Sequence, residues 1–178
     1  ECKKRNITVS NVPSYGTNSV AQHTIALLLE VCNHVWPHNM AVRQGEWKKR
    51  GDFIFHDYPL TELAGKTIGI IGFGNIGSRV AEIARAFEMS IIAHDPSKAG
   101  SKHPFAQFVS LDYLLASSDI ISLHCPLTDS NKYLINRETI SKMKSNAVII
   151  NTSRGGLINE EDLKEALDAG RINAAAVD

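Results

Sequence analysis

The sequence predicts an α/β fold built on a doubly wound parallel sheet, and three observations support this prediction. Short, almost wholly apolar runs such as Asp119–His124 and Ala147–Asn151 are typical of strands that are covered on both faces. These runs alternate with segments whose apolar residues recur every three or four positions, as in helices. A glycine-rich turn directly follows the apolar run Thr67–Ile71. Since parallel strands need long crossover connections, the alternation indicates one sheet with helices on both faces.

The composition of the 178 residues favours one domain that binds a small molecule. This length suits one α/β domain better than two. The 19 basic and 19 acidic residues cancel, so no net charge favours nucleic acid or another polyanion as a partner. No apolar run approaches the roughly 18 residues that a membrane span requires.

The cysteines and histidines form no pattern that is typical of a disulfide framework or a metal site. Cys2, Cys32 and Cys125 are odd in number and contain no CxxC spacing. The histidines fit no shared metal or triad spacing, so we expect no metal. A reducing compartment, the cytoplasm, is the simplest expectation.

Both ends of the chain indicate a fragment. The first residue is Glu1 rather than Met, and the last residues, Ala174–Asp178, resemble a buried strand. We therefore expect a second domain, for the substrate, in the missing flanks. Within an NAD-binding unit of residues 1–178, the expected division is an interdomain segment (1–18), a long helix with a dimerisation arm (19–60) and a Rossmann-type core (66–178).

The first predicted elements are a short strand and a long helix. Ile7–Val12 has the composition of a strand and is followed by Pro13. Asn18 or Ser19 is expected to cap the helix. Its apolar side recurs at three- and four-residue spacing through Val20, Thr24, Leu27, Leu28, Val31 and Val35.

Beyond this helix the sequence predicts an arm that a second subunit covers. Pro37 should kink or end the helix, after which a helical segment resumes. The stretch Lys48–Pro59 lacks periodicity and is expected to be an extended loop. Exposure of Phe53, Phe55 and Tyr58 together would be costly in a monomer. We therefore expect a second subunit to bury these side chains, in a homodimer built on residues 20–60. The alternative is that the missing domain covers them.

The central segment, Lys66–Asp95, has every part of a dinucleotide-binding βαβ unit. Gly72 permits a tight turn after the first strand, Gly74 leaves room for a pyrophosphate, and Gly77 lets the helix pack closely on the sheet. The helix amino terminus favours the phosphate charge. Asp95, after the second strand, is placed to accept hydrogen bonds from the adenosine ribose.

The remaining elements continue the alternation of strands and helices. They are a possible short strand at Phe108–Val109, helices at Leu111–Ser117, Asn136–Met143 and Asn159–Ala169, and the two apolar strands described above. The last helix has the clearest signals, because Asn159 can cap it, acidic residues occupy its first turn and Gly170 follows it.

The carboxyl ends of parallel strands meet at one edge of a sheet, and such folds bind ligands there. Arg154 follows a buried strand and precedes two glycines, so we expect it to project into this crevice. Its planar guanidinium could bind a carboxylate through two hydrogen bonds. The alternative is a surface arginine paired with a nearby acid. The segments expected at this edge are Gly72–Gly77, Asp95, His124–Pro126, Asn151–Gly156 and Asp178.

Over nearly all of its length the sequence resembles the D-isomer-specific 2-hydroxyacid dehydrogenases. The resemblance rests on Ser19–Thr24, Gly72–Gly77, Leu123–Thr128 and Asn151–Gly156, of which the last is the most specific. Within the family, the motifs Tyr15–Ser19 and Asp57–Pro59 are most similar to those of glycerate dehydrogenases, also called hydroxypyruvate reductases.

This resemblance implies NAD as the cofactor and assigns its contacts. Asn75 and Ile76 would present backbone N–H groups to the pyrophosphate, and Asp95 would bind the adenosine ribose. Cys125 would line the adenine side and would not act as a nucleophile. The further cofactor contacts are Gly72, Gly74, Gly77, Pro126, Ser153 and Arg154, with Thr152 and Asp178 holding the nicotinamide carboxamide.

For the reaction, the resemblance implies hydride transfer between NADH and C2 of a small 2-keto acid such as hydroxypyruvate or glyoxylate. Arg154 would hold the substrate carboxylate and polarise the keto oxygen. The family's catalytic glutamate and proton-donating histidine would follow Asp178, outside this sequence. His124 would lie beside the adenine half, too far from the reacting carbon to replace that histidine. Asp95 favours NAD over NADP, although Lys98 could offset its repulsion of a 2′-phosphate.

Two other functions account for part of the pattern. A non-enzymatic NAD-sensing protein, like the corepressors that resemble this family, would share the cofactor site. An S-adenosylmethionine methyltransferase would explain the glycine turn and Asp95 but not Asn151–Gly156. The family often has an asparagine where this chain has Gly16, so no role of that asparagine transfers.

Overall fold

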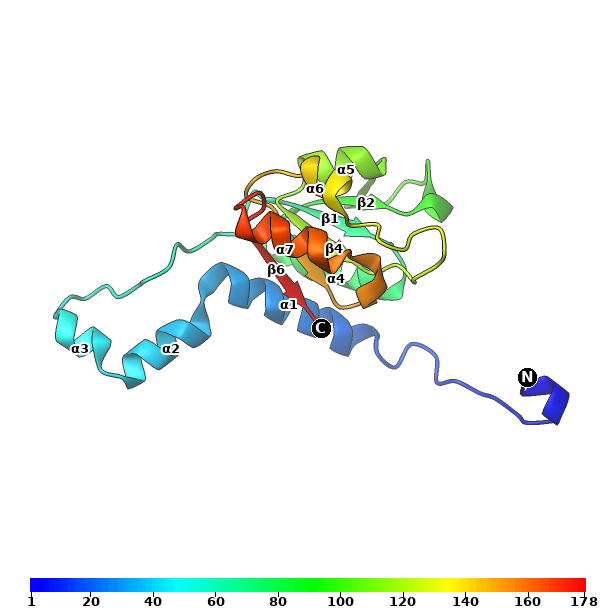
Figure 1. The fold of residues 1–178 in the computed structure, drawn as a ribbon, viewed down its shortest axis with the longest axis horizontal. Coiled ribbons are helices and arrows are strands. Elements are labelled where there is room, and N and C mark those ends of the chain that lie inside the picture. The colour runs from blue at the N-terminus through cyan, green and yellow to red at the C-terminus, as the bar shows by residue number, and fades with distance from the viewer.

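The computed structural model describes residues 1–178 and contains one six-stranded sheet in which all strands are parallel (Figure 1). The strand order is β3-β2-β1-β4-β5-β6, which places the first strand near the centre and winds the chain outward in both directions. This confirms the doubly wound parallel prediction. The strands are β1 Thr67–Ile71, β2 Ser90–His94, β3 Gln107–Phe108, β4 Ile120–Leu123, β5 Val148–Asn151 and β6 Ala174–Val177.

Helices cover both faces of the sheet and form two apolar cores. The helices are α1 Thr17–Asn33, α2 Val35–Arg43, α3 Glu46–Arg50, α4 Asn75–Ala86, α5 Leu111–Ser117, α6 Arg137–Ser141 and α7 Glu160–Asp168. Leu28 of α1 and Val80 of α4 pack with Ile70 and its neighbours on one face. Leu114 of α5 and Leu163 of α7 pack with the side chains that face the other way. None of the helices is both long and apolar enough to cross a membrane.

The predicted amino-terminal strand is wrong. Residues 7–12 form no strand and are exposed, because no other segment of the chain runs beside them to complete a hydrogen-bonded ladder. The following helix begins at Thr17, and its N-cap, Gly16, lies two residues before the predicted cap Asn18 and three before Ser19.

The break in the long helix lies before Pro37. Helix α1 ends at Asn33, and His34 has a left-handed φ of 50°. Pro37 instead lies in the first turn of α2, where a missing N–H costs no helical hydrogen bond. The expected extended loop Lys48–Pro59 is also partly wrong, since α3 includes Lys48–Arg50. Residues 35–60, here called the arm, project away from the sheet (Figure 1).

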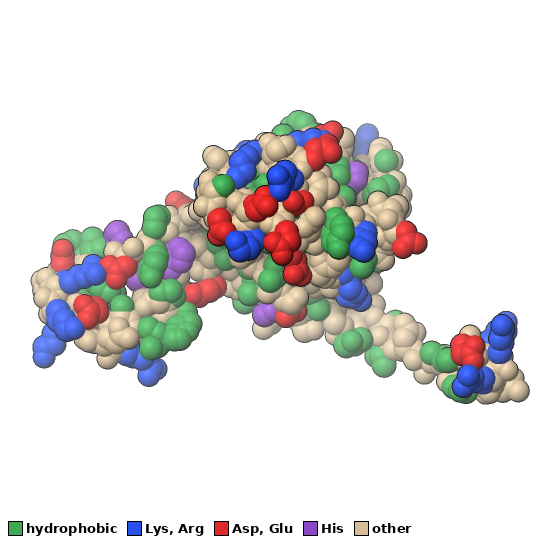
Figure 2. All heavy atoms as spheres, in the orientation of Figure 1, with side chains coloured by type: hydrophobic (Ala, Val, Ile, Leu, Met, Phe, Trp, Pro, Cys, Tyr) green, Lys and Arg blue, Asp and Glu red, His purple; other side chains and the backbone are tan.

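The arm has a small core of its own and an exposed apolar surface. Phe55, expected to need cover from a second subunit, stacks on Trp47 of the same chain with ring centroids 6.1 Å apart and lies under the guanidinium of Arg50. Phe53 is 86% exposed, and Trp36 is also exposed. Hydrophobic side chains therefore gather on the surface of the arm (Figure 2).

Candidate cofactor and substrate-carboxylate site

The parallel register brings the predicted site residues to one edge of the sheet. Ile71 pairs with His94 on one side and Leu123 on the other, while Asn151 pairs with Leu123 and with Val177. The strands β2, β1, β4, β5 and β6 therefore end side by side. From Asp95 after β2 to the residue after β5 is three strand spacings, or roughly 14 Å. That span suits an extended ligand such as a dinucleotide.

The glycine turn is fixed by contacts that no side chain would permit. Gly72 has a φ of 91°, and a Cβ there would lie 2.6 Å from the backbone nitrogen of Cys125. A Cβ on Gly77 would lie 2.1 Å from the carbonyl oxygen of Gly72. Gly77 thus lets α4 pack closely, as the sequence predicts, and Gly72 also lets the turn contact the residues that follow β4.

In contrast, Gly74 faces open space, and the helix that follows it has free donors. No atom lies within 4 Å of a Cβ placed on Gly74. The backbone N–H groups of Asn75, Ile76 and Gly77 have no hydrogen-bond partner, and the first turn of α4 contains no acidic residue. Free N–H groups at a helix amino terminus bind phosphate oxygens well, so this region fits the pyrophosphate of a dinucleotide.

Asp95 is held against the glycine turn in its ionised form. One carboxylate oxygen accepts a hydrogen bond from the Phe73 N–H at 3.0 Å, and the other accepts from the Ser97 hydroxyl at 2.7 Å and the Ser97 N–H at 3.0 Å. Burial raises the pKa of Asp95, but these hydrogen bonds and the charge of Lys98 outweigh it, so the pKa lies below its usual value. The carboxylate is thus positioned as an acceptor at the crevice.

Lys98 is engaged with the same turn. Its Nζ donates to the carbonyl oxygen of Phe73 at 2.6 Å and lies 5.4 Å from the centre of the Phe73 ring. A 2′-phosphate would have to compete with this hydrogen bond for the ammonium. Lys98 is therefore poorly placed to offset the repulsion between the Asp95 carboxylate and a 2′-phosphate.

The loop after β4 is fastened to the loop after β5. The Ser153 hydroxyl donates to the carbonyl oxygen of Cys125 at 2.7 Å, and Asn131 donates to the carbonyl oxygen of Pro126 at 2.8 Å. Burial raises the pKa of the Cys125 thiol, and the charge of Asp95 raises it further. The thiol is therefore a poor nucleophile.

Arg154 is presented by a turn that Asn151 closes. Asn151 is 3% exposed; its amide nitrogen donates to the carbonyl oxygen of Arg154 at 3.0 Å, and its amide oxygen accepts from the Ser153 N–H at 3.0 Å. The exposed guanidinium of Arg154 donates to the carbonyl oxygen of Ser153 and forms no ion pair with any acid of the chain. This contradicts the alternative of a surface arginine paired with an acid. Nε and Nη2 of Arg154 have no partner in the chain and can donate to a ligand carboxylate.

Thr152 and Asp178 lie at the same end of the crevice, and both face helix α1. The Asp178 N–H donates to the carbonyl oxygen of Asn151 at 3.0 Å, which makes the residues after β5 and β6 neighbours. The Thr152 hydroxyl lies 2.8 Å from that of Thr24, and Nε2 of His23 lies 3.8 Å from a carboxylate oxygen of Asp178. The sequence motif includes His23 and Thr24, but nothing in it predicts these contacts.

His124 is a packed residue. Its Nε2 lies 2.8 Å from the hydroxyl of Ser122, and burial lowers the pKa of its imidazole to about 4. The ring is therefore a neutral imidazole near pH 7, so it cannot serve as an imidazolium acid. No group of three or more His, Cys, Asp or Glu side chains in the chain could hold a metal ion.

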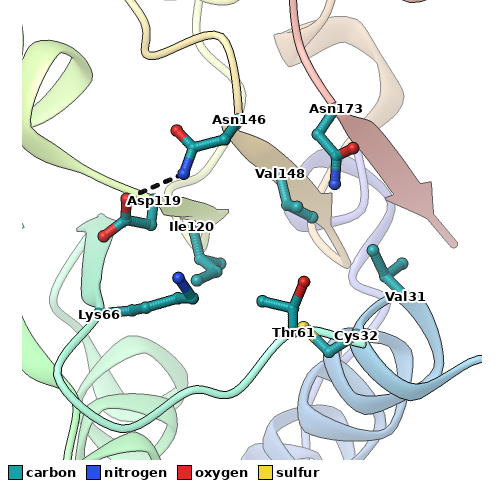
Figure 3. Close-up of a pocket in the computed structure, with 9 residues that line it drawn as sticks. All are labelled: Val31, Cys32, Thr61, Lys66, Asp119, Ile120, Asn146, Val148 and Asn173. Atoms are coloured by element: carbon teal, nitrogen blue, oxygen red, sulfur yellow. Dashed lines mark hydrogen bonds between the residues drawn. The ribbon is translucent and has the colours of Figure 1, made fainter. Parts of the chain in front are cut away.

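A cavity lies at the opposite edge of the sheet, where the strands begin (Figure 3). It has a volume of about 190 Å³ and is lined by Lys66, Asp119, Asn146 and Asn173, among others. Asn146 donates to Asp119 across its wall. None of the predicted site residues lines this cavity.

Comparison with known proteins agrees with the geometry at the carboxyl edge. Residues 25–178 match the family described as "D-isomer specific 2-hydroxyacid dehydrogenase, NAD binding domain". A hydroxypyruvate reductase from Blautia hydrogenotrophica is 48% identical over 177 residues, covering 99% of this chain and 55% of that protein. The chain thus spans about half the length of the curated relatives that it matches.

Two solved structures have the same fold. An acyclic imino acid reductase in complex with NADPH and D-Arg superposes with a TM-score of 0.85 and 38% identity, covering 99% of this chain and 55% of that one. A D-lactate dehydrogenase with NAD+ from Lactobacillus jensenii gives a TM-score of 0.81 and 34% identity, covering 99% of this chain and 52% of that one.

Proposed function

The chain belongs to the D-isomer-specific 2-hydroxyacid dehydrogenase family, as its NAD-binding domain, and from this premise we propose the reaction of the whole enzyme. Hydride passes between NAD(H) and C2 of a small 2-keto or D-2-hydroxy acid. The favoured pair is hydroxypyruvate and glycerate, with glyoxylate as a further substrate. The observation that carries the proposal is the guanidinium of Arg154, which lies at the cofactor edge and forms no ion pair within the chain.

In this proposal, the chain binds the cofactor across five strand ends. The pyrophosphate occupies the open space beside Gly74 and accepts hydrogen bonds from Asn75 and Ile76. Asp95 accepts from the adenosine ribose, Cys125 and Pro126 line the adenine, and Thr152, Ser153 and Asp178 face the nicotinamide. Support comes from the free N–H groups of α4, the unfilled space at Gly74 and the fixed carboxylate of Asp95.

Arg154 supplies the substrate contact that lies within this chain. Its two parallel N–H groups hold the carboxylate, and its positive charge stabilises the oxygen at C2 as negative charge develops there. NADH, when bound, supplies the hydride. The proton for that oxygen would come from the family's glutamate and histidine pair after Asp178, because His124 is neutral and packed.

The narrow substrate choice is supported by the 48% identity with a hydroxypyruvate reductase. A non-enzymatic NAD-sensing protein is the alternative. Steady-state kinetics of the full-length protein with NADH and either hydroxypyruvate or glyoxylate distinguish the two. Turnover of hydroxypyruvate is the expected result, and binding of NADH without turnover of any 2-keto acid would favour the sensor.

We also propose a homodimer in the cytoplasm. The exposed apolar surface of the arm, including Trp36 and Phe53, supports an interface built on residues 20–60. The three free cysteines support a reducing compartment.

A further inference from the structure

Helix α1 crosses behind the proposed nicotinamide end of the site and touches it with two consecutive side chains. His23 approaches Asp178, and Thr24 contacts Thr152, so each of the two residues assigned to the carboxamide has one neighbour on α1. The helix packs against both β5 and β6, whose carboxyl ends lead into these residues (Figure 1). The side chains of His23 and Asp178 are at least half exposed, and their nearest nitrogen and oxygen atoms are 3.8 Å apart. Solvent therefore weakens the interaction between them.

The contact of Thr24 is of a different kind, because it is buried and its hydrogen-bond direction can be worked out. Thr24 is 1% exposed, and its Oγ1 lies 2.9 Å from the carbonyl oxygen of Val20 and 2.8 Å from Oγ1 of Thr152. A carbonyl oxygen can only accept, so the single hydroxyl hydrogen of Thr24 goes to Val20. The hydroxyl of Thr152 must then donate to Thr24.

We propose that Thr24 is a positioning residue for the nicotinamide half of the cofactor, acting through Thr152. The hydrogen bond commits the hydroxyl hydrogen of Thr152 to Thr24 and fixes the Thr152 side chain against α1. It thereby holds the backbone between Asn151 and Arg154 at a constant place. This inference rests on the proposed function, since it needs Thr152 at the nicotinamide.

The effect should be confined to one end of the ligand. Thr152 follows β5 and Asp95 follows β2, so these two residues lie three strand spacings, or roughly 14 Å, apart. The glycine turn and Asp95 have their own hydrogen bonds, and none of these involves Thr24. Loss of the Thr24 hydroxyl should therefore weaken binding of the nicotinamide and leave binding of ADP-ribose intact.

The test is calorimetric titration of the chain with NADH and, separately, with ADP-ribose. Thr24→Val removes the hydroxyl at nearly constant volume, and we expect NADH to bind about three- to tenfold more weakly while the affinity for ADP-ribose stays within twofold. Thr24→Ser should keep the affinity of the unaltered chain for NADH. Thr61→Val is the matched control, because the Thr61 hydroxyl forms no hydrogen bond and lies in the cavity at the opposite edge.

Each outcome decides the question. Equal weakening of both ligands by Thr24→Val, or no weakening of NADH, would overturn the inference and leave the proposed function standing. If the unaltered chain bound ADP-ribose as tightly as NADH, the placement of Thr152 at the nicotinamide would fail, and this inference with it. If circular dichroism showed Thr24→Val to be unfolded, Thr24→Ala and Thr24→Ser, which differ by one hydroxyl, would serve as the pair.

Discussion

The buried side chain of Asn151 closes the turn that carries Arg154, donating to the carbonyl oxygen of Arg154 at 3.0 Å. Asn151→Asp keeps the size and the acceptor for Ser153 but removes this donor and buries a charge. We expect a loss of about 1–3 kcal/mol in the free energy of unfolding, measured by urea denaturation at pH 7. The exposed Asn39, changed to Asp, should stay within about 0.5 kcal/mol. Equal midpoints for the two variants would contradict the role of Asn151.

Gly72 and Gly74 should respond to alanine in opposite ways. At Gly72 a Cβ meets backbone atoms at 2.6 Å and φ is positive, so Gly72→Ala should lower the melting temperature substantially. At Gly74 a Cβ meets no protein atom, so Gly74→Ala should melt like the unaltered chain. The new methyl group would occupy the space proposed for the pyrophosphate, and binding of NADH should fall at least tenfold.

Thermal melting and calorimetry on the same two variants separate these effects. If Gly74→Ala bound NADH normally, the pyrophosphate would lie elsewhere.

Arg154 should be intolerant of lysine in the full-length enzyme. Lysine keeps the charge but lacks the planar pair of donors that binds a carboxylate. We expect Arg154→Lys to raise KM and lower kcat together, with a loss of about 10²- to 10³-fold in kcat/KM. Lys164→Ala, which removes a surface ion pair with Asp168, is the control and should be silent. An unchanged kcat/KM for hydroxypyruvate in Arg154→Lys would remove Arg154 from the reaction.

Most of the sheet could be predicted because its signals are local. The strand Thr67–Ile71 and the helix Leu111–Ser117 agree with the prediction to the residue, since their apolar patterns lie within the segments themselves. The meeting of Asp95 and Arg154 at one edge follows from the parallel topology alone, without any knowledge of packing.

The errors concern features that depend on distant parts of the chain. Residues 7–12 have the composition of a strand, but a strand also needs a neighbour, which local composition does not reveal. The hydrogen bond between Thr24 and Thr152 joins residues 128 positions apart and depends on where α1 crosses the sheet. The first helix ends at His34, whose left-handed φ takes the place of the glycine that usually signals a helix end, so the sequence contains no clear stop before Pro37.

His124 should make the stability of the chain depend on pH between about 6.5 and 4. Its pKa in the folded chain is about 4, below the usual value near 6.5, because burial disfavours the charged ring. As the pH falls from 6.5 to 4, the unfolded chain takes up a proton that the folded chain does not, so this contribution is complete above pH 6.5 and is lost toward pH 4.

The measurement is the free energy of unfolding in urea at several pH values. Between pH 6.5 and 4, the free energy of unfolding of His124→Gln should change less steeply with pH than that of the unaltered chain. The two slopes should differ by up to roughly 1.4 kcal/mol per pH unit. Parallel curves for His124→Gln and the unaltered chain would show that the ring titrates alike in both states.

The exposed apolar side chains of the arm lead to the prediction that the chain is a dimer at micromolar concentration. Phe53 is 86% exposed and Trp36 about half exposed, on a segment that projects from the sheet. Burial of such side chains in a second subunit removes apolar surface from water, at about 25 cal/mol per Å². Changing both residues to glutamate should give a monomer by light scattering, with the melting curve of the core retained. Tyr113→Glu, on α5 and about as exposed as Trp36, is the control and should remain a dimer. A monomeric mass for the unaltered chain would refute an interface on residues 20–60 that forms without the rest of the enzyme.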